Sequence, residues 1–216
     1  MVRALDGLRI LDLSSGPVAG IATMILADFG ADVIKIERPG GDPFRFLPTS
    51  PMWLRGKRSV ELDLKRKIEQ SRLHFLAQNA DVVVSNIRQN SAVGLGADYD
   101  VLSVKNSGLV YVHLTGFGKH GSYSSYPGYE DVVAAKTGRM QSFAGTAPRE
   151  GPQFSAVQVA SHAASQAIVS GVLAALISRK RTGLGQYVQT SMLRCMLTYE
   201  QGDLIRRQLA EIDNEQ

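Results

Sequence analysis

Apolar runs alternate with segments of helical spacing along the first part of the chain. Residues 8–13 form a short apolar run typical of a buried strand, residues 17–29 place apolar side chains at helical intervals, and residues 33–37 again have the pattern of a strand. A strand, a helix and a strand within about thirty residues predict a βαβ unit with a right-handed crossover and two parallel strands. The chain therefore begins as an open α/β sheet.

The same alternation continues, more loosely, toward the end of the chain. Further strands are predicted at residues 59–64, 81–84, 109–114 and 186–190. Helices are predicted at residues 65–78, 99–105, 129–136, 157–181 and 192–212, with loops at residues 43–51, 119–127 and 145–151. Gly183 suits a left-handed cap after three basic residues, which marks the end of the long helix. The predicted fold class is α/β, a mostly parallel open sheet with flanking helices.

The composition is that of a folded globular protein. The chain has 216 residues, of which 44% are hydrophobic and 20% charged, both near the averages for such domains. A single cysteine, Cys195, excludes an internal disulfide, a CxxC pair and a Cys/His metal cluster. The first ten residues lack the pattern of a secretory signal. We therefore expect a reducing, cytoplasmic location and no metal cofactor.

The charge pattern points away from nucleic acid and membranes. The net charge of +4 is spread along the chain rather than massed in a basic patch, so an anionic small ligand is enough to explain it. Residues 157–178 carry no charged side chain, but their glutamines, serines and histidine are too polar for a lipid interior. We expect no nucleic-acid partner and no membrane span.

The first predicted strand ends in Ser14, Ser15, Gly16 and Pro17, directly before a helix. Ligands of open parallel sheets bind at the carboxyl ends of strands. Pro17 suits the first helical turn, the serines can cap the helix, and the free amide groups of that turn would face a phosphate. A capped helix start without any ligand explains the same residues equally well.

The second strand ends in Glu37, followed by Arg38. An acid about twenty residues beyond a glycine turn is what nicotinamide dinucleotide sites use to bind the ribose, so an NAD(P)-binding domain is one alternative. The GxGxxG fingerprint is absent, because the turn offers only Gly16 and Gly20. Residues 55–58 add a basic group that either holds phosphates or is a solvated loop.

Six sequence blocks, in a fixed order, carry a resemblance to a known family. They are LDGLRILDLSSG, ILADFGADVIKIERPGGDPFR, RGKRSVELDLK, ADVVVSNIR, LTGFGKHGSYSSYPGYEDVVAAKTG and VLAALISRKRTGLGQYVQTS. In this order they resemble the amino-terminal part of the large domain of the class III CoA-transferases, which include formyl-CoA and carnitine CoA-transferases and the 2-methylacyl-CoA racemases. The resemblance implies a Rossmann-like large domain, an inserted smaller domain and an interlocked dimer, in chains roughly twice this length. Residues 1–191 then form part of the large domain, and residues 192–216 a terminal helix leading toward a small domain that this chain lacks.

The resemblance also implies a CoA site. The positions that match the family's CoA contacts are Gly16, Pro17, Val18, Arg38, Leu62, Asn86 and Ile87. The family often has a phenylalanine after that asparagine and an arginine eight residues beyond it. Here those positions hold Ile87 and Gly94, so one phosphate contact is lost and we expect weakened CoA affinity.

A catalytic carboxylate is implied just before a Gly-Pro pair, where the family has an aspartate. Here the match is Glu150, followed by Gly151 and Pro152. In the family that carboxylate attacks the acyl thioester, gives a mixed anhydride and then holds CoA as a thioester. Glutamate moves the charge by one methylene, and such a displacement is poorly tolerated in catalysis. The alternative reading of Glu150 is an exposed loop acid paired with Arg149.

Other candidate acids and bases have structural explanations as well. Glu130 and Asp131 are the next carboxylates to suspect, but acids at a helix N-terminus also complement the helix dipole. The racemases of the family use a histidine at the position of Tyr129 and an aspartate near Ala160, and this chain has neither. His162 lies close to the second position, and we expect a packed core histidine there.

The sequence therefore favours an acyl-CoA:carboxylate CoA-transferase that acts through a carboxylate-bound intermediate. Its partners would be an acyl-CoA and a carboxylic acid, with coenzyme A as substrate and no metal. A homodimer, or association with a second CoA-transferase chain, is expected. The blocks GYEDVVAAKTG and APREGPQF also resemble larger acyl-CoA transferases with two family domains. The alternative is accordingly a catalytically silent subunit that binds CoA or forms the dimer.

Overall fold

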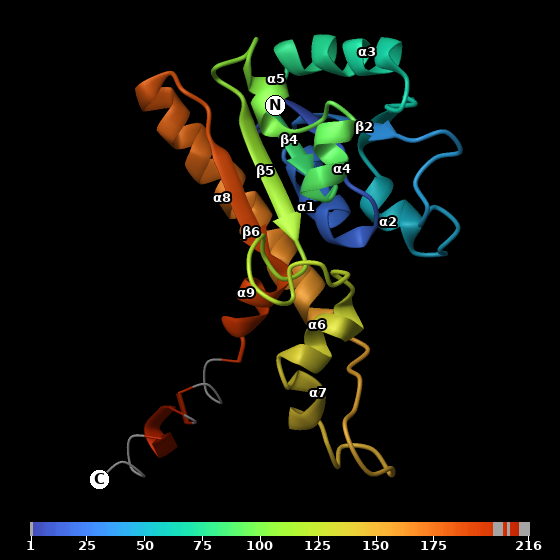
Figure 1. Ribbon diagram of the computed structural model, residues 1–216, viewed down its shortest axis with the longest axis vertical. Coiled ribbons are helices and arrows are strands. Elements are labelled where there is room, and N and C mark those ends of the chain that lie inside the picture. Colours follow the sequence, from blue (N-terminus) through green and yellow to red (C-terminus); the bar gives the residue numbers. More distant parts are fainter. Residues whose placement is uncertain (1, 201–204, 207, 212–216) are drawn as a thin grey trace. The chain divides into compact units, whose positions relative to one another are not determined.

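The computed structural model describes residues 2–200, 205–206 and 208–211. The chain forms two compact units (Figure 1). The first comprises Met1–Thr115 and Ser165–Thr190, and the second comprises Gly116–Ala164 and Ser191–Gln216. The boundary predicted after residue 191, between a large domain and a helix leading toward a small domain, concerns a longer protein and stays a prediction.

Six strands form a single sheet in the order β3-β2-β1-β4-β5-β6. They are β1 (Arg9–Asp12), β2 (Asp32–Glu37), β3 (Lys57–Glu61), β4 (Val82–Ser85), β5 (Val110–Thr115) and β6 (Tyr187–Ser191). The first five strands are parallel to their neighbours. Gln186 O accepts a hydrogen bond from Tyr111 N–H, and Thr190 O accepts one from Thr115 Oγ1. Residue numbers thus rise together along β5 and β6, so β6 is parallel too, and the predicted open α/β sheet is confirmed.

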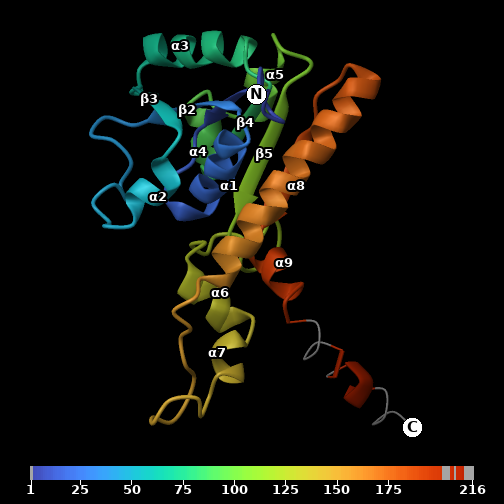
Figure 2. The ribbon, with the colours of Figure 1, turned by 180° about the vertical axis from the view of Figure 1, so that it is seen from behind.

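Helices pack on both faces of this sheet. The described helices are α1 (Pro17–Asp28), α2 (Ser50–Leu54), α3 (Lys67–Gln78), α4 (Gln89–Gly94), α5 (Tyr99–Ser103), α6 (Glu130–Lys136), α7 (Arg139–Ser142), α8 (Val159–Thr182) and α9 (Met192–Leu197). In the first unit α1 and α8 lie on one face of the sheet, where Ser165 Oγ donates to Val18 O (Figures 1 and 2). Helices α3 and α5 pack on the opposite face. This is the layered arrangement that βαβ crossovers produce.

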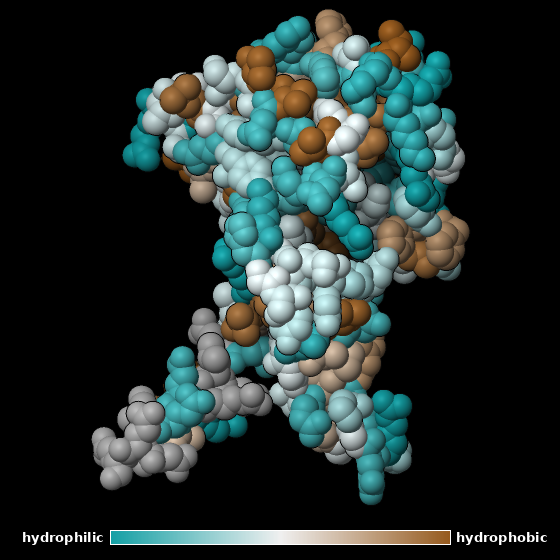
Figure 3. Space-filling model, viewed as in Figure 1, coloured by the Kyte–Doolittle hydropathy of each residue, from teal (hydrophilic) through white to brown (hydrophobic). Residues whose placement is uncertain are grey.

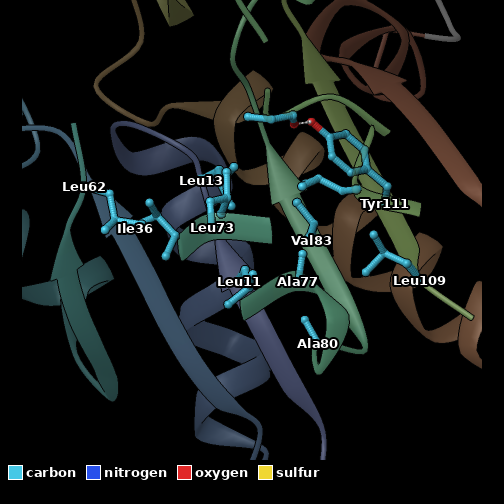
Figure 4. Close-up of a cluster of buried hydrophobic side chains, with 12 residues drawn as sticks. Leu11, Leu13, Ile36, Leu62, Leu73, Ala77, Ala80, Val83, Leu109 and Tyr111 are labelled. Atoms are coloured by element: carbon cyan, nitrogen blue, oxygen red, sulfur yellow. Dashed lines mark hydrogen bonds between the residues drawn. The ribbon is translucent and has the colours of Figure 1, made fainter. Parts of the chain in front are cut away.

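The core between the sheet, α3 and α5 is continuous and apolar (Figure 4). Leu11, Val83 and Tyr111 come from the central strands, and Leu73 and Ala77 come from α3. Tyr111 is buried, and its hydroxyl donates a 2.8 Å hydrogen bond to the Ala97 carbonyl. Each fully buried leucine or valine contributes about 1.5–3 kcal/mol, so this cluster fixes the sheet on which the site is built.

Helix α8 is apolar and partly buried. By length and composition it could cross a membrane, and 44% of its apolar window is buried. Its buried apolar side chains in the first unit, Ile168, Val172 and Ala175, recur every three to four residues and therefore share one face. Gly183 has φ 76° and donates a 2.7 Å hydrogen bond to Arg179 O, so the predicted helix end is confirmed.

Several elements differ from the prediction. Helix α2 begins inside the predicted loop of residues 43–51, the short helices α4 and α7 were not predicted, and β3 lies two to three residues earlier than expected. The continuous helix predicted over residues 192–212 is wrong, because α9 ends at Leu197. Thr198 Oγ1 donates a 2.6 Å hydrogen bond to Cys195 O, so a side chain satisfies a backbone carbonyl near the end of the helix. Residues 205–206 and 208–211 are helical again, whereas residues 201–204, 207 and 212 lie outside the described residues.

Candidate functional site

A cavity of about 580 Å³ lies in the first unit, at the carboxyl ends of β1, β2 and β3. Its volume is typical of small-molecule sites, and its position is where open parallel sheets bind ligands. The strand ends and the loops after β2, β3 and β4 supply its lining. These lining residues are Leu13, Ser14, Ser15, Lys35, Ile36, Glu37, Arg38, Pro39, Gly41, Asp42, Pro43, Leu62, Asp63, Leu64, Lys65, Ile87 and Leu95.

The apolar wall of the cavity is an extension of the core. Leu13, Ile36 and Leu62 line the cavity and also belong to the buried cluster drawn in Figure 4. Ile87, in the loop after β4, and Leu95, directly after α4, pack against the same cluster. Because these side chains are fixed by core packing, the wall is a preformed apolar surface suited to a flat ring such as a nucleobase.

Two cations stand at the rim of the cavity. Arg38 follows β2, Lys65 follows β3, and both are exposed. Among the described residues, neither side chain forms an ion pair or a hydrogen bond, so both are available to a phosphate. Lys65 was missed at the level of sequence, although the signal was present in the polar residues that follow the third strand.

Glu37 is not available for a ribose. Its side chain is 8% exposed and its carboxylate is paired with the Arg45 guanidinium. The acid that the dinucleotide alternative requires is thus bound within the chain. The geometry therefore favours a phosphate ligand at Arg38 over a diol at Glu37.

The turn between β1 and α1 is fixed by hydrogen bonds to the side chains of Asp12, Asn86 and Asp42. Gly16 has φ 77° and is the N-cap of α1 without a side-chain cap, so the expected serine capping is wrong. The Ser14 hydroxyl instead donates to Asp12 Oδ1 at 2.5 Å. Asn86 Oδ1 accepts from Ser15 N–H at 3.0 Å, and Asn86 Nδ2 donates to Ser15 O at 2.9 Å. Gly16 N–H donates to Asp42 Oδ2 at 3.3 Å, so the amides of Ser15 and Gly16, which precede the helix, already have partners within the chain.

The structure brings together only part of the predicted CoA contacts. Arg38, Leu62 and Ile87 line the cavity, and Asn86 holds the lining residue Ser15. The remaining three, Gly16, Pro17 and Val18, form the start of α1 and do not line it. Gly94 lies in α4 beside the lining residue Leu95, with nothing within 4 Å of the position of a Cβ.

Two buried ion pairs lie beneath the turn. Lys57 Nζ is 2.8 Å from Asp12 Oδ2, Lys35 Nζ is 3.0 Å from Asp42 Oδ2, and each of the four side chains is at most 2% exposed. Lys57 Nζ also donates to Thr23 Oγ1 at 2.6 Å. Burial alone would raise the pKa of Asp12, but the charges of Lys35 and Lys57 lower it to about 2. Burial lowers the pKa of Lys57 despite its carboxylate partner.

The basic group of residues 55–58 does not reach the cavity. Arg55 pairs with Asp28 at 2.6 Å and Arg58 pairs with Asp32 at 2.6 Å. Lys57 is buried against Asp12. All three positive charges are thus used within the fold, and the phosphate-binding reading of this group receives no support.

Glu150 belongs to the second unit, in an exposed loop. Arg149 was expected as its partner, but the guanidinium donates to Gln153 Oε1 at 3.0 Å and to Pro152 O at 3.1 Å. The buried Gln153 side chain in turn donates to Arg149 O at 3.1 Å. Hydrogen bonds between its own residues therefore stabilise the loop. The catalytic role of Glu150 stays a prediction.

Glu130 has a structural role in the same unit. Its carboxylate accepts hydrogen bonds from Ala160 N–H at 3.0 Å, from Ser161 N–H at 2.7 Å and from Ser161 Oγ at 2.7 Å. It thereby caps α8, so its charge acts on a second helix as well as on the first turn of α6. His162 is exposed, so the expectation of a core histidine is wrong: its neighbours Ser161 and Ala163 take the buried side of the helix.

The described residues include no group of three or more His, Cys, Asp or Glu side chains placed to hold a metal ion.

The chain is similar to curated CoA-transferases from several organisms. It is 35% identical over 205 residues to the probable fatty acyl-CoA transferase Rv3272 of Mycobacterium tuberculosis, covering 88% of this chain and 50% of the relative. It is 36% identical over 208 residues to the succinate–glutarate CoA-transferase of Agrobacterium fabrum, with coverages of 88% and 51%. It is 33% identical over 229 residues to the formyl-CoA:oxalate CoA-transferase of Streptomyces coelicolor, with coverages of 99% and 55%. The chain thus spans about half the length of these relatives.

Solved structures agree with the sequence comparison. A crystal structure of Rv3272 superimposes with a TM-score of 0.87 at 34% identity, covering 95% of this chain and 59% of that one. A CAIB/BAIF family protein from Brucella suis gives a TM-score of 0.86 at 29% identity, with coverages of 95% and 58%. The sequence model of CoA-transferase family III matches residues 5–215. The chain therefore belongs to CoA-transferase family III.

Proposed function

We propose that the first unit binds the nucleotide end of a CoA thioester and that the chain takes part in CoA transfer between an acyl-CoA and a carboxylic acid. The observation that carries the proposal is the cavity at the carboxyl ends of β1–β3, which combines an apolar wall with the unpaired cations Arg38 and Lys65 at its rim. A nucleobase fits the wall, and phosphate groups fit the cations. The family membership supports the same ligand.

Calorimetric titration of the purified chain tests this binding. We expect CoA to bind in the micromolar range, dephospho-CoA to bind more weakly because one phosphate is lost, and NADP to give no comparable heat. Arg38→Ala should weaken CoA binding about tenfold, as expected for one charge-assisted phosphate contact. The matched control is Arg55→Ala, which removes another exposed arginine, whose partner is Asp28. Equal CoA affinity for both variants would contradict the proposal.

For the chemistry we propose Glu150 as the nucleophile. Its carboxylate would attack the thioester carbonyl, form a mixed anhydride and expel the CoA thiolate. The thiolate would then attack the carbonyl of Glu150, releasing the acyl group as a carboxylate and leaving a glutamyl–CoA thioester. Attack by the acceptor acid and return of the thiolate would regenerate Glu150 and give the new acyl-CoA.

A silent CoA-binding or dimer-forming subunit is a second candidate. The observation that favours it is that no described residue hydrogen-bonds to Glu150 or forms an ion pair with it, whereas catalytic carboxylates are usually oriented by neighbours. The two candidates differ in the purified, intact assembly. A Glu150→Gln substitution should abolish transfer if Glu150 is the nucleophile and leave it unchanged if the chain is silent. Glu150→Asp, which restores the residue type of the family, serves as the conservative comparison.

A further inference from the structure

Asp42 places a carboxylate at the inner end of the cavity. Its side chain is 1% exposed, yet it contributes to the cavity lining together with Lys35 and Ser14. Oδ2 lies 3.0 Å from Lys35 Nζ and accepts from Gly16 N–H at 3.3 Å, and Oδ1 accepts from Phe44 N–H at 2.9 Å. Two backbone amides and one ammonium therefore converge on this carboxylate.

The same set of donors is what an open α/β sheet usually offers to a bound phosphate. Such a site joins an amide at the start of the first helix to a nearby cation, and the helix dipole favours the negative charge. Here Gly16 supplies the amide and Lys35 the cation, but the anion belongs to the chain itself. Ser15 N–H is bonded to Asn86, and Pro17 has no N–H. Three successive positions thus offer no amide to an incoming anion.

We propose that Asp42 is a specificity-determining residue whose carboxylate fills the anion position at the start of α1. A ligand that must place its pyrophosphate there, as a nicotinamide dinucleotide does in an open α/β sheet, is rejected. Phosphates are then admitted only at the rim, next to Arg38 and Lys65. The rim contacts rest on the proposed CoA binding, whereas the filled anion position does not depend on it.

Replacing the carboxylate by an added anion tests the filled position directly. Asp42→Ala removes the carboxylate, leaves Lys35 buried without its partner and opens a space of the size of formate. We expect Asp42→Ala to melt at a lower temperature than the wild-type chain in sodium chloride. Sodium formate at the same ionic strength should raise its Tm by about 5 °C, because an anion that binds only the folded state stabilises it. The wild-type chain should show no difference between the two salts.

Asp28→Ala is the matched control. It removes an aspartate of α1 whose partner, Arg55, is exposed, so solvent already screens the charge that is left. Formate and chloride should therefore affect Asp28→Ala equally. Equal effects of the two salts on Asp42→Ala would overturn the proposal. If Asp42→Ala does not fold in chloride, recovery of folded protein on refolding in formate supports the proposal, and failure in both salts overturns it.

Inorganic phosphate gives the readout for specificity. Binding of phosphate at the rim is common to the wild-type chain and Asp42→Ala and so cancels in the comparison. We expect phosphate to raise the Tm of Asp42→Ala by several degrees more than that of the wild-type chain, and NAD to give no binding heat with the wild-type chain. Equal phosphate effects, or micromolar NAD binding to the wild-type chain, would overturn the proposal. Absence of CoA binding would contradict the proposed function while leaving the formate and phosphate results intact.

Discussion

At the scale of single residues, buried charges shape the wall of the cavity. Asp12 Oδ1 accepts from both the amide and the hydroxyl of Ser14, and Lys35 Nζ donates to the Ser14 carbonyl at 2.7 Å. Ser14 lines the cavity, so the position of this part of the wall depends on the buried charges of Asp12 and Lys35. Burying four charged groups costs solvation, and this cost is offset only while every partner is present.

The Asp12–Lys57 pair should therefore respond strongly to the loss of one partner. We expect Asp12→Asn and Lys57→Met each to lower the free energy of unfolding by about 3–5 kcal/mol, because each leaves an uncompensated buried charge. The double variant should lose less than the sum of the two single losses. Urea denaturation of the four proteins measures this coupling. The exposed pair Asp28 and Arg55 is the control, with an expected coupling below about 1 kcal/mol; strict additivity at Asp12 and Lys57 would contradict the prediction.

The depressed pKa of Asp12 also predicts loss of stability in acid. The folded pKa of Asp12, about 2, lies below the usual aspartate value of 3.8, so the folded state favours the ionised carboxylate. The resulting stabilisation, about 2 kcal/mol, is present above pH 4 and is lost as the pH falls from about 4 to about 2. Denaturation curves recorded over this range give the free energy of unfolding at each pH. As the pH falls, this free energy should decrease more steeply for the wild-type chain than for the Asp12→Asn/Lys57→Met variant. Parallel pH profiles of the two proteins would show that Asp12 is not the group responsible.

At the scale of elements, Glu130 connects α6 to the first turn of α8. It stands in the first turn of α6, yet its carboxylate accepts three hydrogen bonds from Ala160 and Ser161 at the start of α8. A carboxylate in that place satisfies backbone donors that have no partner inside the helix. The neighbouring Asp131 is exposed and has no such contact to α8 among the described residues.

We therefore expect Glu130→Ala to destabilise the second unit by about 2 kcal/mol, in the range of a charged capping group. Asp131→Ala should cost less than about 1 kcal/mol, because only the dipole of α6 is affected. Hydrogen exchange resolves the effect, since the amides of Ala160 and Ser161 should exchange faster in Glu130→Ala alone. Unchanged exchange at these two amides would mean that Glu130 does not cap α8.

The strands and long helices could be predicted because their periodicity is local. Helix α1 differs from its prediction at one end only, by one residue, and β2 likewise. Helices α2, α4 and α7 have four to six residues, too few turns for a periodic signal. Contacts distant in sequence left no local signal at all: Lys57 meets Asp12 across 45 positions and Asn86 meets Ser15 across 71. Arg38 was found from its place directly after the second strand and Leu62 by resemblance, whereas Lys35 and Asp42 required the fold.

At the scale of the whole molecule, the two units carry different parts of the proposed chemistry. Every residue that lines the cavity belongs to the first unit, and Glu150 belongs to the second. CoA binding and the nucleophile can therefore be tested with separate variants. The chain also spans about half the length of its curated relatives.

Exposed apolar side chains on the first unit bear on the predicted association of chains. Leu173 and Ile177 on α8, together with Leu184 just after it, are 37%, 63% and 59% exposed, and Figure 3 shows apolar groups over this helix among hydrophilic neighbours. Leu173 and Ile177 are four residues apart and so share one face of the helix. Contiguous exposed apolar side chains are a common feature of protein interfaces, so this face of α8 is where we expect self-association.

We accordingly expect the purified chain to sediment as a species larger than one chain. Ile177→Lys should shift it toward the monomer, because a charge buried at an interface without a partner is costly. Ile68→Lys is the control, since Ile68 is similarly exposed, at 56%, but lies on α3 on the other side of the sheet. A wild-type chain that sediments as a single monomeric species would mean that α8 does not mediate self-association. A larger species that Ile177→Lys and Ile68→Lys affect equally would place the interface elsewhere on the molecule.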